Sequence, residues 1–276
     1  MKLIESGYKI IPQEPGLDGI YKICEIAGRT AYKSEDKITD GSAKRFVDAL
    51  IKLNHGAVLE HGTVYLKLKW WQIFKKLKFV FNPYSRIRKF KYITTNLRVL
   101  MENNWMNDLK YLCDPTKYHE KRITVKFICS RSIAQEATRH RVFSFLMESQ
   151  RYVAYIKDKF GGEITYIIPD WVKLRMDELT EDAFVDCQDK AVKHWWEFLR
   201  YAEHEYMGLL KLDLKAEEAR SVLPNDCKTE LVMTGFVKDW EHFFDLRALD
   251  KTGKAHPDIK ALACPLRAEF ILNNYI

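Results

Sequence analysis

The 276-residue sequence has no run of about 20 apolar residues, the length that a membrane-spanning helix needs. The N-terminal residues also lack the apolar core of a secretory signal. From these absences we expect no membrane helix and a cytoplasmic location. A hydrophobic content of 47% still provides for a substantial core, and no linker-like tract interrupts it, so we expect one domain spanning residues 1–276.

Cysteine is sparse and dispersed. The sequence has no Cys-x-x-Cys pair and no spacing typical of a zinc site or a disulfide scaffold. We therefore expect reduced, mostly buried thiols and no metal. A cysteine nucleophile is the alternative, but no neighbouring pattern favours a lowered thiol pKa. The six cysteines are Cys24, Cys113, Cys129, Cys187, Cys227 and Cys264.

Glycine-rich phosphate loops are also missing, since neither Gly-x-Gly-x-x-Gly nor a Walker pattern occurs. If a nucleotide binds, side chains and helix ends must hold its phosphates. Acidic residues are absent from residues 75–91, here called the basic arm, which carries as many Lys and Arg residues as the net charge of +7. Its interleaved aromatic residues suit either a single-strand nucleic-acid platform or a solvated basic β-hairpin. We favour the hairpin and expect no nucleic-acid partner.

Hydrophobic periodicity predicts an α+β fold, with a mixed sheet flanked by helices and a helical C-terminal third. The predicted strands are residues 3–11, 63–70, 123–129 and 164–168. The predicted helices are residues 17–31, 41–54, 94–104, 132–142, 181–212, 215–223 and 229–246, with a last one starting near His256. The aromatic residues of the 181–212 helix suit core or oligomer packing.

Residues 139–152 read Arg-His-Arg-Val-Phe-Ser-Phe-Leu-Met-Glu-Ser-Gln-Arg-Tyr, which places three guanidiniums beside an imidazole and two hydroxyls. Arginine forks match phosphate oxygens, and each charge-assisted hydrogen bond contributes about 1.5–3 kcal/mol. On a continuous helix Arg139 and Arg141 would diverge by about 200°, which favours two ligands or a neighbouring subunit. We expect residues 144–150 to form a ligand-contacting loop. The alternative is a helix end held by ion pairs to Glu136 and Glu148.

Other polar residues lie in apolar surroundings. His55, Glu60 and His61 match no recognised metal-ligand spacing, so a cap, a core histidine or a cofactor contact is favoured. Arg220 and Arg247 lie on apolar helical stretches, and a buried arginine needs an anion. Either an internal ion pair or a ligand would satisfy each of them.

Arg139-His140-Arg141, followed by seven residues and Ser149 with Arg151-Tyr152 behind it, resembles the signature of the flavin-dependent thymidylate synthases. Further blocks similar to the family occur in the same order. They are Leu59-Glu60-His61, Arg131-Ser132, Gln135-Glu136 and residues 155–169, 219–224, 240–247 and 255–257. The similarity covers most of the chain except the basic arm and residues 104–120.

This resemblance implies methylation of dUMP to dTMP by a homotetramer whose subunits build each site together. Methylenetetrahydrofolate would donate the carbon, FAD would carry the hydride and NADPH would be the reductant. Arg247 would be the chief catalytic residue, because a fixed positive charge favours the N3-deprotonated pyrimidine. The matched positions would bind dUMP through Glu136, Arg139, Ser149, Gln150, Arg151, Arg220 and Arg247. FAD would face His55, Arg139, His140, Arg141 and His242.

Three positions depart from the family pattern on the implied flavin side. Leu146 replaces a polar residue, Gly56-Ala57 replace Glu-Ser, and Phe236 replaces asparagine. Three alternatives therefore stay open: a catalytically weak relative that only binds nucleotides, single-strand nucleic-acid binding through the basic arm, and Ser149 as a nucleophile. The last is disfavoured because no base stands beside Ser149 in the sequence.

Overall fold

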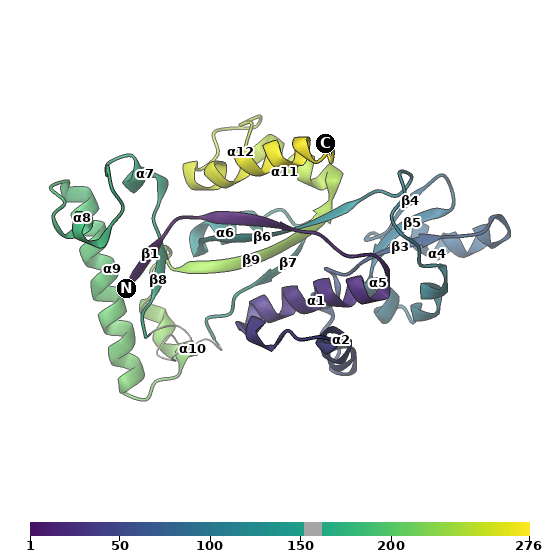
Figure 1. Ribbon diagram of the computed structural model, residues 1–276, viewed down its shortest axis with the longest axis horizontal. Helices are drawn as coiled ribbons and strands as arrows, with labels where there is room; N and C mark the ends of the chain where they lie inside the picture. The colour runs from purple at the N-terminus through teal and green to yellow at the C-terminus, as the bar shows by residue number, and fades with distance from the viewer. Residues whose placement is uncertain (152–161) are drawn as a thin grey trace.

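A four-stranded antiparallel sheet forms the centre of the computed structural model, which describes residues 1–151 and 162–276 (Figure 1). The two middle strands pair over nine residues, from Arg122 opposite Phe236 to Ser130 opposite Lys228. Because these strands lie about 100 residues apart in the sequence, the sheet is held together by long-range contacts. Its strands, in spatial order, are β2 (Gly7–Ile11), β6 (Arg122–Ser130), β9 (Lys228–Phe236) and β7 (Ser144–Met147).

Helices cover both faces of this sheet. On β7, Phe145 and Met147 pack toward one core, whereas Leu146 between them packs toward the other. Figure 1 shows α1 on one side and α11 with α12 on the opposite side. The helices on the first side include α1 (Gly16–Tyr32) and α2 (Ser42–Lys52), and those on the second are α6 (Arg131–Ala137), α11 (Val237–Arg247) and α12 (Pro257–Leu272).

A second sheet lies at one end of the molecule, at the right of Figure 1. Its strand order is β3 (Thr63–Lys67), β5 (Tyr92–Asn96) and β4 (Arg86–Arg88), all antiparallel. Short helical segments surround it: α3 (Gly56–Leu59), α4 (Leu77–Val80), α5 (Leu97–Glu102) and the 3-10 turns Trp70–Lys76 and Met106–Tyr111.

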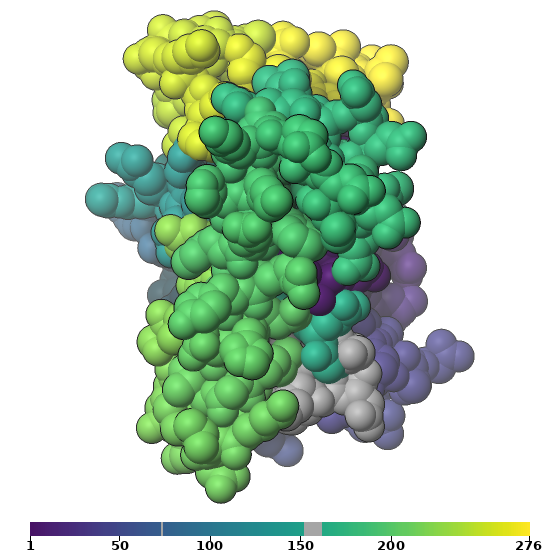
Figure 2. Space-filling view, turned by 90° about the vertical axis from the view of Figure 1, so that its left-hand side faces the viewer, coloured from purple at the N-terminus to yellow at the C-terminus, as the bar shows by residue number. Residues whose placement is uncertain are grey.

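The opposite end carries the parallel pair β1 (Lys2–Ile4) and β8 (Thr165–Ile167). Figure 2 views this end and shows the green helices of residues 181–211 covering it. None of the helices in the described parts of the chain is long and apolar enough to cross a membrane. The remaining elements are α7 (Asp170–Lys173), α8 (Glu181–Val185), α9 (Lys190–Lys211), α10 (Ala216–Ala219) and the 3-10 turns Glu35–Lys37 and Arg220–Val222.

The predicted α+β class is confirmed, as are α1, α2, α12, β3, β6 and β8. The predicted mixed sheet is wrong, because the described strands form two antiparallel sheets and a separate parallel pair. The predicted helix 229–246 is wrong in its first half, which is β9. Eight of the nine β9 residues are buried, so the strand lacks the alternation that would have separated it from a helix. The predicted loop 144–150 is wrong in the same way, because its first four residues are β7.

Other predictions were wrong at element boundaries. The predicted strand 3–11 divides into β1 and β2, and residues 94–96 belong to β5 before Asn96 caps α5. The Asp189 carboxylate caps α9 and so divides the predicted helix 181–212. Residues 215–223 form only the short α10 and a 3-10 turn, and most of the basic arm is helical or irregular rather than a hairpin. The helix predicted over 132–142 ends at Ala137. Arg139 and Arg141 therefore do not lie on one continuous helix, and the divergence of about 200° expected for such a helix does not apply.

Candidate functional site

Arg247 lies in a side-chain cluster at the C-terminal end of α11. Its Nε donates to His140 Nε2 at 3.1 Å, and its Nη1 lies 3.0 Å from a Glu136 carboxylate oxygen. Only 17% of the Arg247 side chain is exposed. The negative end of the α11 dipole adds to the stabilisation of this cation. The structure thus brings together three residues that the sequence analysis selected.

His140 is held neutral in this cluster. Its side chain is buried in the turn after α6, and burial together with the charges of Arg247 and Arg139 lowers its pKa to about 4. Since the guanidinium can only donate, His140 Nε2 accepts and its proton resides on Nδ1. The neutral imidazole therefore orients Arg247 without opposing its charge.

A close aromatic contact positions the turn that carries Arg139, His140 and Arg141. The Phe143 ring lies so near Gly235 of β9 that an added Cβ would approach it to 2.3 Å. His140 also stands edge-on to Phe243, with ring centroids 5.0 Å apart. Exposed His242 on α11 has its ring centroid 6.4 Å from that of His140. The packing of β9 and α11 thus fixes where the turn presents its arginines.

Several arginines of the predicted site point to solvent without an acid beside them. The side chains of Arg139, Arg141 and Arg220 are exposed and make no ion pair with any described residue. Arg151 is different, because its Nε lies 3.6 Å from Glu217 on α10. This contact links the segment after β7 to the element that precedes Arg220. Most of the arginines selected from the sequence therefore have no carboxylate partner among the described residues.

A second group of predicted residues lines a cavity of about 390 Å³ between α1, α3 and β7. Tyr32, His55 and Ser149 supply its polar groups, and the other walls are mostly apolar. This volume lies in the range of small-molecule sites. The lining residues are Ala31, Tyr32, His55, Gly56, Ala57, Val58, Leu146 and Ser149.

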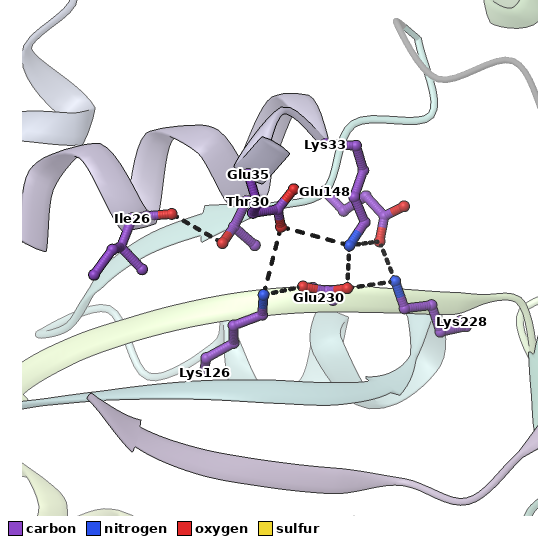
Figure 3. Close-up of polar contacts among 8 residues, drawn as sticks. All are labelled: Ile26, Thr30, Lys33, Glu35, Lys126, Glu148, Lys228 and Glu230. Atoms are coloured by element: carbon purple, nitrogen blue, oxygen red, sulfur yellow. Dashed lines mark hydrogen bonds and ion pairs between the residues drawn. The ribbon is translucent and has the colours of Figure 1, made fainter. Parts of the chain in front are cut away.

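The segment from Glu148 to Arg151 is anchored by a buried charge network (Figure 3). Lys228 Nζ lies 2.9 Å from Glu148 and 2.7 Å from Glu230, and Lys33 and Lys126 also pair with Glu230. Burial alone would raise the pKa of Glu230, but these ammonium groups outweigh it and lower that pKa to about 2.

Backbone hydrogen bonds complete this anchor. The Glu148 N–H donates to Glu230 O at 2.8 Å, and the Ser149 N–H donates to Ala31 O at 3.0 Å. Next along the chain, the Gln150 side chain is buried and its Nε2 has no hydrogen-bond partner among residues 1–151 and 162–276. A buried unpaired donor is costly, so this amide is free to serve a ligand. Tyr152 and residues 155–161 of the family pattern lie outside the described residues.

The two groups are not brought together in one chain. The Arg247 cluster lies on the α11 side of β7, whereas the cavity with His55 and Ser149 lies on the α1 side. Within the described segments, no hydrogen bond or ion pair joins them.

The alternative chemistries find little support in the geometry. Burial raises the pKa of Cys24, Cys129 and Cys227 to about 12, so these thiols are not activated. His61 is fully buried with its Nδ1 2.8 Å from Thr234 Oγ1, whereas His55 is exposed, so the two do not form a ligand pair. The Ser149 hydroxyl accepts from the Arg151 N–H, and no base from the described residues hydrogen bonds to it.

The residues that depart from the family pattern lie at two different locations in the structure. Leu146 and the pair Gly56-Ala57 line the cavity, but Phe236 does not. The Phe236 ring instead lies between guanidiniums, with the Arg86 and Arg122 Cζ atoms 5.0 and 5.6 Å from its centroid. The sequence analysis did not select Lys33, Glu148, Lys228 or Glu230 as anchors, because no local pattern connects residues so distant in sequence.

Comparison with known proteins supplies the family. The model of the family described as thymidylate synthase complementing protein matches residues 118–271. The chain belongs to this family. The recognition drawn from the Arg-His-Arg motif is therefore confirmed.

Curated relatives carry the name flavin-dependent thymidylate synthase. The Corynebacterium efficiens protein is 33% identical over 143 residues, covering 49% of this chain and 52% of that protein. The protein of Mycobacterium sp. strain JLS is 25% identical over 268 residues, covering 92% and 78%. The chain spans about half the length of several curated relatives that it matches. A solved UMP/dUMP methylase from Streptomyces cacaoi with 5-Br dUMP aligns over 99% of this chain and 93% of its own, at 18% identity and a TM-score of 0.47, too low for a comparison of sites.

Proposed function

We propose that this chain methylates dUMP to dTMP, with methylenetetrahydrofolate as carbon donor, FAD as hydride carrier and NADPH as reductant. The observation that carries this proposal is the Arg247 cluster, in which Glu136 and neutral His140 hold a largely buried guanidinium. Family membership and the names of the relatives support the same reaction.

The uncommitted arginines suit the phosphate of a nucleotide. Arg139, Arg141 and Arg220 have no carboxylate partner in the described parts of the chain, so a phosphate need not displace an internal ion pair. Charge-assisted hydrogen bonds of about 1.5–3 kcal/mol each would then give substantial affinity. We infer that Arg139 and Arg220 hold dUMP through its phosphate, together with Arg151, Ser149 and Gln150, and that Arg141 faces the flavin.

Arg247 would act on the pyrimidine ring rather than on the phosphate. Its charge, partly removed from water, stabilises negative charge that develops on the base when N3 is deprotonated. His140 keeps the guanidinium oriented and, being neutral, does not reduce its effect. Glu136 balances that charge before the substrate arrives.

The cavity beside β7 fits the flat ring system of a flavin in chemical character. Its walls are mostly apolar, and His55 and Ser149 offer polar atoms beside them. A bound flavin would supply the hydride that completes the methyl group. The chain itself would orient the flavin through His55 on one side and Arg139, His140, Arg141 and His242 on another.

The separation of these groups supports a homotetramer with shared sites. The cavity and the Arg247 cluster lie on opposite faces of β7, so a site built from two subunits would use one group from each. This reason replaces the one based on a continuous helix through Arg141, which the structure does not have. Light scattering of the purified protein would measure the assembly.

The decisive experiment is dTMP formation from dUMP, methylenetetrahydrofolate, FAD and NADPH. It should be run beside Arg247→Ala, an FAD-free control and Arg45→Ala, which removes an exposed arginine of α2. We expect flavin-dependent product from the parent and Arg45→Ala proteins and almost none from Arg247→Ala. Flavin-loaded, folded protein that makes no dTMP would contradict the proposal.

That negative result would favour the second candidate, a nucleotide-binding relative with little activity. Its specific support is that Leu146 and Ala57, two departures from the family pattern, line the cavity proposed for the flavin. dUMP affinity measured by calorimetry would then remain even though dTMP is not formed.

A further inference from the structure

A stripe of large apolar side chains stands exposed on the helical segment made of the 3-10 turn Trp70–Lys76 and α4. Trp70, Phe74, Leu77 and Phe81 follow one another at intervals of four, three and four residues along this segment. Their exposed fractions are 75, 82, 49 and 83%. Trp71 and Val80 are exposed beside them. A contiguous apolar surface of this kind marks an interaction site.

Positive charge surrounds the stripe. Residues 69–91 contain eight Lys and Arg residues and no Asp or Glu. Two of the eight are neutralised from elsewhere, Lys78 by Asp108 and Arg88 by Glu120. The remaining six have no carboxylate within ion-pair distance among the residues described: Lys69, Lys75, Lys76, Arg86, Lys89 and Lys91.

We propose that this surface docks the protein on an anionic lipid bilayer. The docking face, as we call it, comprises Trp70, Trp71, Phe74, Leu77, Val80 and Phe81 with Lys69, Lys75 and Lys76. Exposed tryptophan, phenylalanine and leucine with lysines between them is the composition of a segment that lies in the membrane interface. Each lysine near an anionic leaflet adds about 1 kcal/mol of attraction, while its alkyl chain covers apolar surface.

The details of the face favour lipid over single-stranded nucleic acid. Base stacking needs open ring faces, but Lys69 Nζ lies 5.2 Å over the Trp71 ring. Trp70 and Trp71 meet edge to face, with an interplanar angle of 86°, rather than as parallel platforms. Leu77 and Val80 contribute aliphatic surface that no base stacks on but that acyl chains accept.

The details also disfavour a second copy of the chain as the occupant. A two-fold contact through the face would place Lys69, Lys75 and Lys76, which have no carboxylate partner among the described residues, close to the same three lysines of the partner. The face also lies outside residues 118–271, which match the family model, so it is not part of the matched family core. This inference does not rest on the proposed reaction, because none of its residues belongs to the candidate site.

The test is sedimentation of the full chain with phosphatidylcholine vesicles, with and without phosphatidylserine. We expect binding only to the anionic vesicles. Phe74→Ser with Phe81→Ser, and separately Lys75→Glu with Lys76→Glu, should each weaken it at least tenfold. The controls on α9, Phe198→Ser with Tyr201→Ser and Lys190→Glu with Lys193→Glu, also change exposed aromatic and lysine side chains and should bind as the parent does.

Three results would overturn the proposal. One is the absence of binding to anionic vesicles, or equal binding to neutral ones. Another is displacement of bound protein from vesicles by oligothymidylate, which would assign the face to nucleic acid. The third is a change of oligomeric state in the docking-face variants, measured by light scattering, which would make it a subunit interface.

Discussion

Arg247 donates two hydrogen bonds, from Nε to His140 Nε2 at 3.1 Å and from Nη1 to Glu136 Oε2 at 3.0 Å. The guanidinium at the end of α11 thus binds one neutral acceptor and one carboxylate at the same time. The arrangement fixes two of its edges in space before any ligand is present. Orientation and charge can therefore be tested separately.

Arg247→Lys keeps the charge but loses the planar fork, and Arg247→Ala loses both. We expect kcat to fall about 100- to 1000-fold for Arg247→Ala, the size of effect seen when one transition-state charge stabiliser is removed. Arg247→Lys should fall between this variant and the parent. Steady-state dTMP formation measures both, with Arg45→Ala as the control, and full activity of Arg247→Ala would refute the catalytic assignment.

Acid stability should report the neutral state of His140. Its folded pKa of about 4 lies below the unfolded value near 6.5, so the unfolded state binds more protons between these values. Stability is therefore complete above about pH 6.5 and declines toward pH 4, by roughly 3 kcal/mol at most.

The measurement is urea unfolding between pH 7 and pH 4.5, comparing the parent with His140→Gln. The slope of stability against pH should be smaller in the variant, whatever its absolute stability. Stopping at pH 4.5 excludes Glu230, whose stabilisation is lost only as pH falls below its ordinary value toward about 2. Identical slopes would show that His140 titrates normally.

Removing Lys228 alone from its contacts with Glu148 and Glu230 should lower the free energy of unfolding substantially (Figure 3). Lys228→Met leaves Glu148, whose side chain is 2% exposed, with Lys33 only at 3.9 Å. We expect a loss of about 3–5 kcal/mol, as for other buried pairs that lose one partner. Lys228→Met with Glu148→Gln should lose less than the sum of the single changes.

The exposed pair of Lys22 and Glu14 is the control, because Lys22→Met should leave the free energy of unfolding almost unchanged. Chemical denaturation gives the free energies. Since Glu148 precedes Ser149 and Gln150, the KM for dUMP should rise in the Lys228 variant more than kcat falls. An unchanged KM would separate the network from substrate binding.

Flavin affinity should respond to the wall of the cavity. Leu146→Asn restores the polar residue usual in the family pattern and should tighten FAD binding, measured by flavin fluorescence quenching, by about tenfold, the value of roughly one hydrogen bond. Phe236→Asn is the matched control, because Phe236 does not line the cavity. It should leave FAD affinity unchanged while lowering stability. Equal effects of both variants would place the flavin elsewhere.

Sequence-based prediction succeeded for elements that have one buried face and one solvent-exposed face. In α1 and α2 one face is buried and the other solvated, so the helical period is visible. In β9 nearly every residue is buried, and in β7 only four residues lie between two turns. Such strands owe their conformation to partners across the sheet, which local pattern does not contain.

The candidate site divides in the same way. The resemblance to the family selected the residues that meet around Arg247: His140 came from the Arg-His-Arg motif and Glu136 from the block before it. The buried anchor could not be found, since Lys33 and Glu230 are 197 positions apart and lysine with glutamate usually indicates a solvated surface.

That separation has a consequence for the order of events during synthesis. Because β9 is the inner partner of both β6 and β7, a growing chain that has not yet released residue 236 from the ribosome has neither the central ladder nor the anchor for Ser149. Domains with such long-range pairing fold late and expose strand edges meanwhile. We therefore expect the emerging polypeptide to need protection from aggregation, and the segment that carries Ser149 to become ordered only near the end of translation.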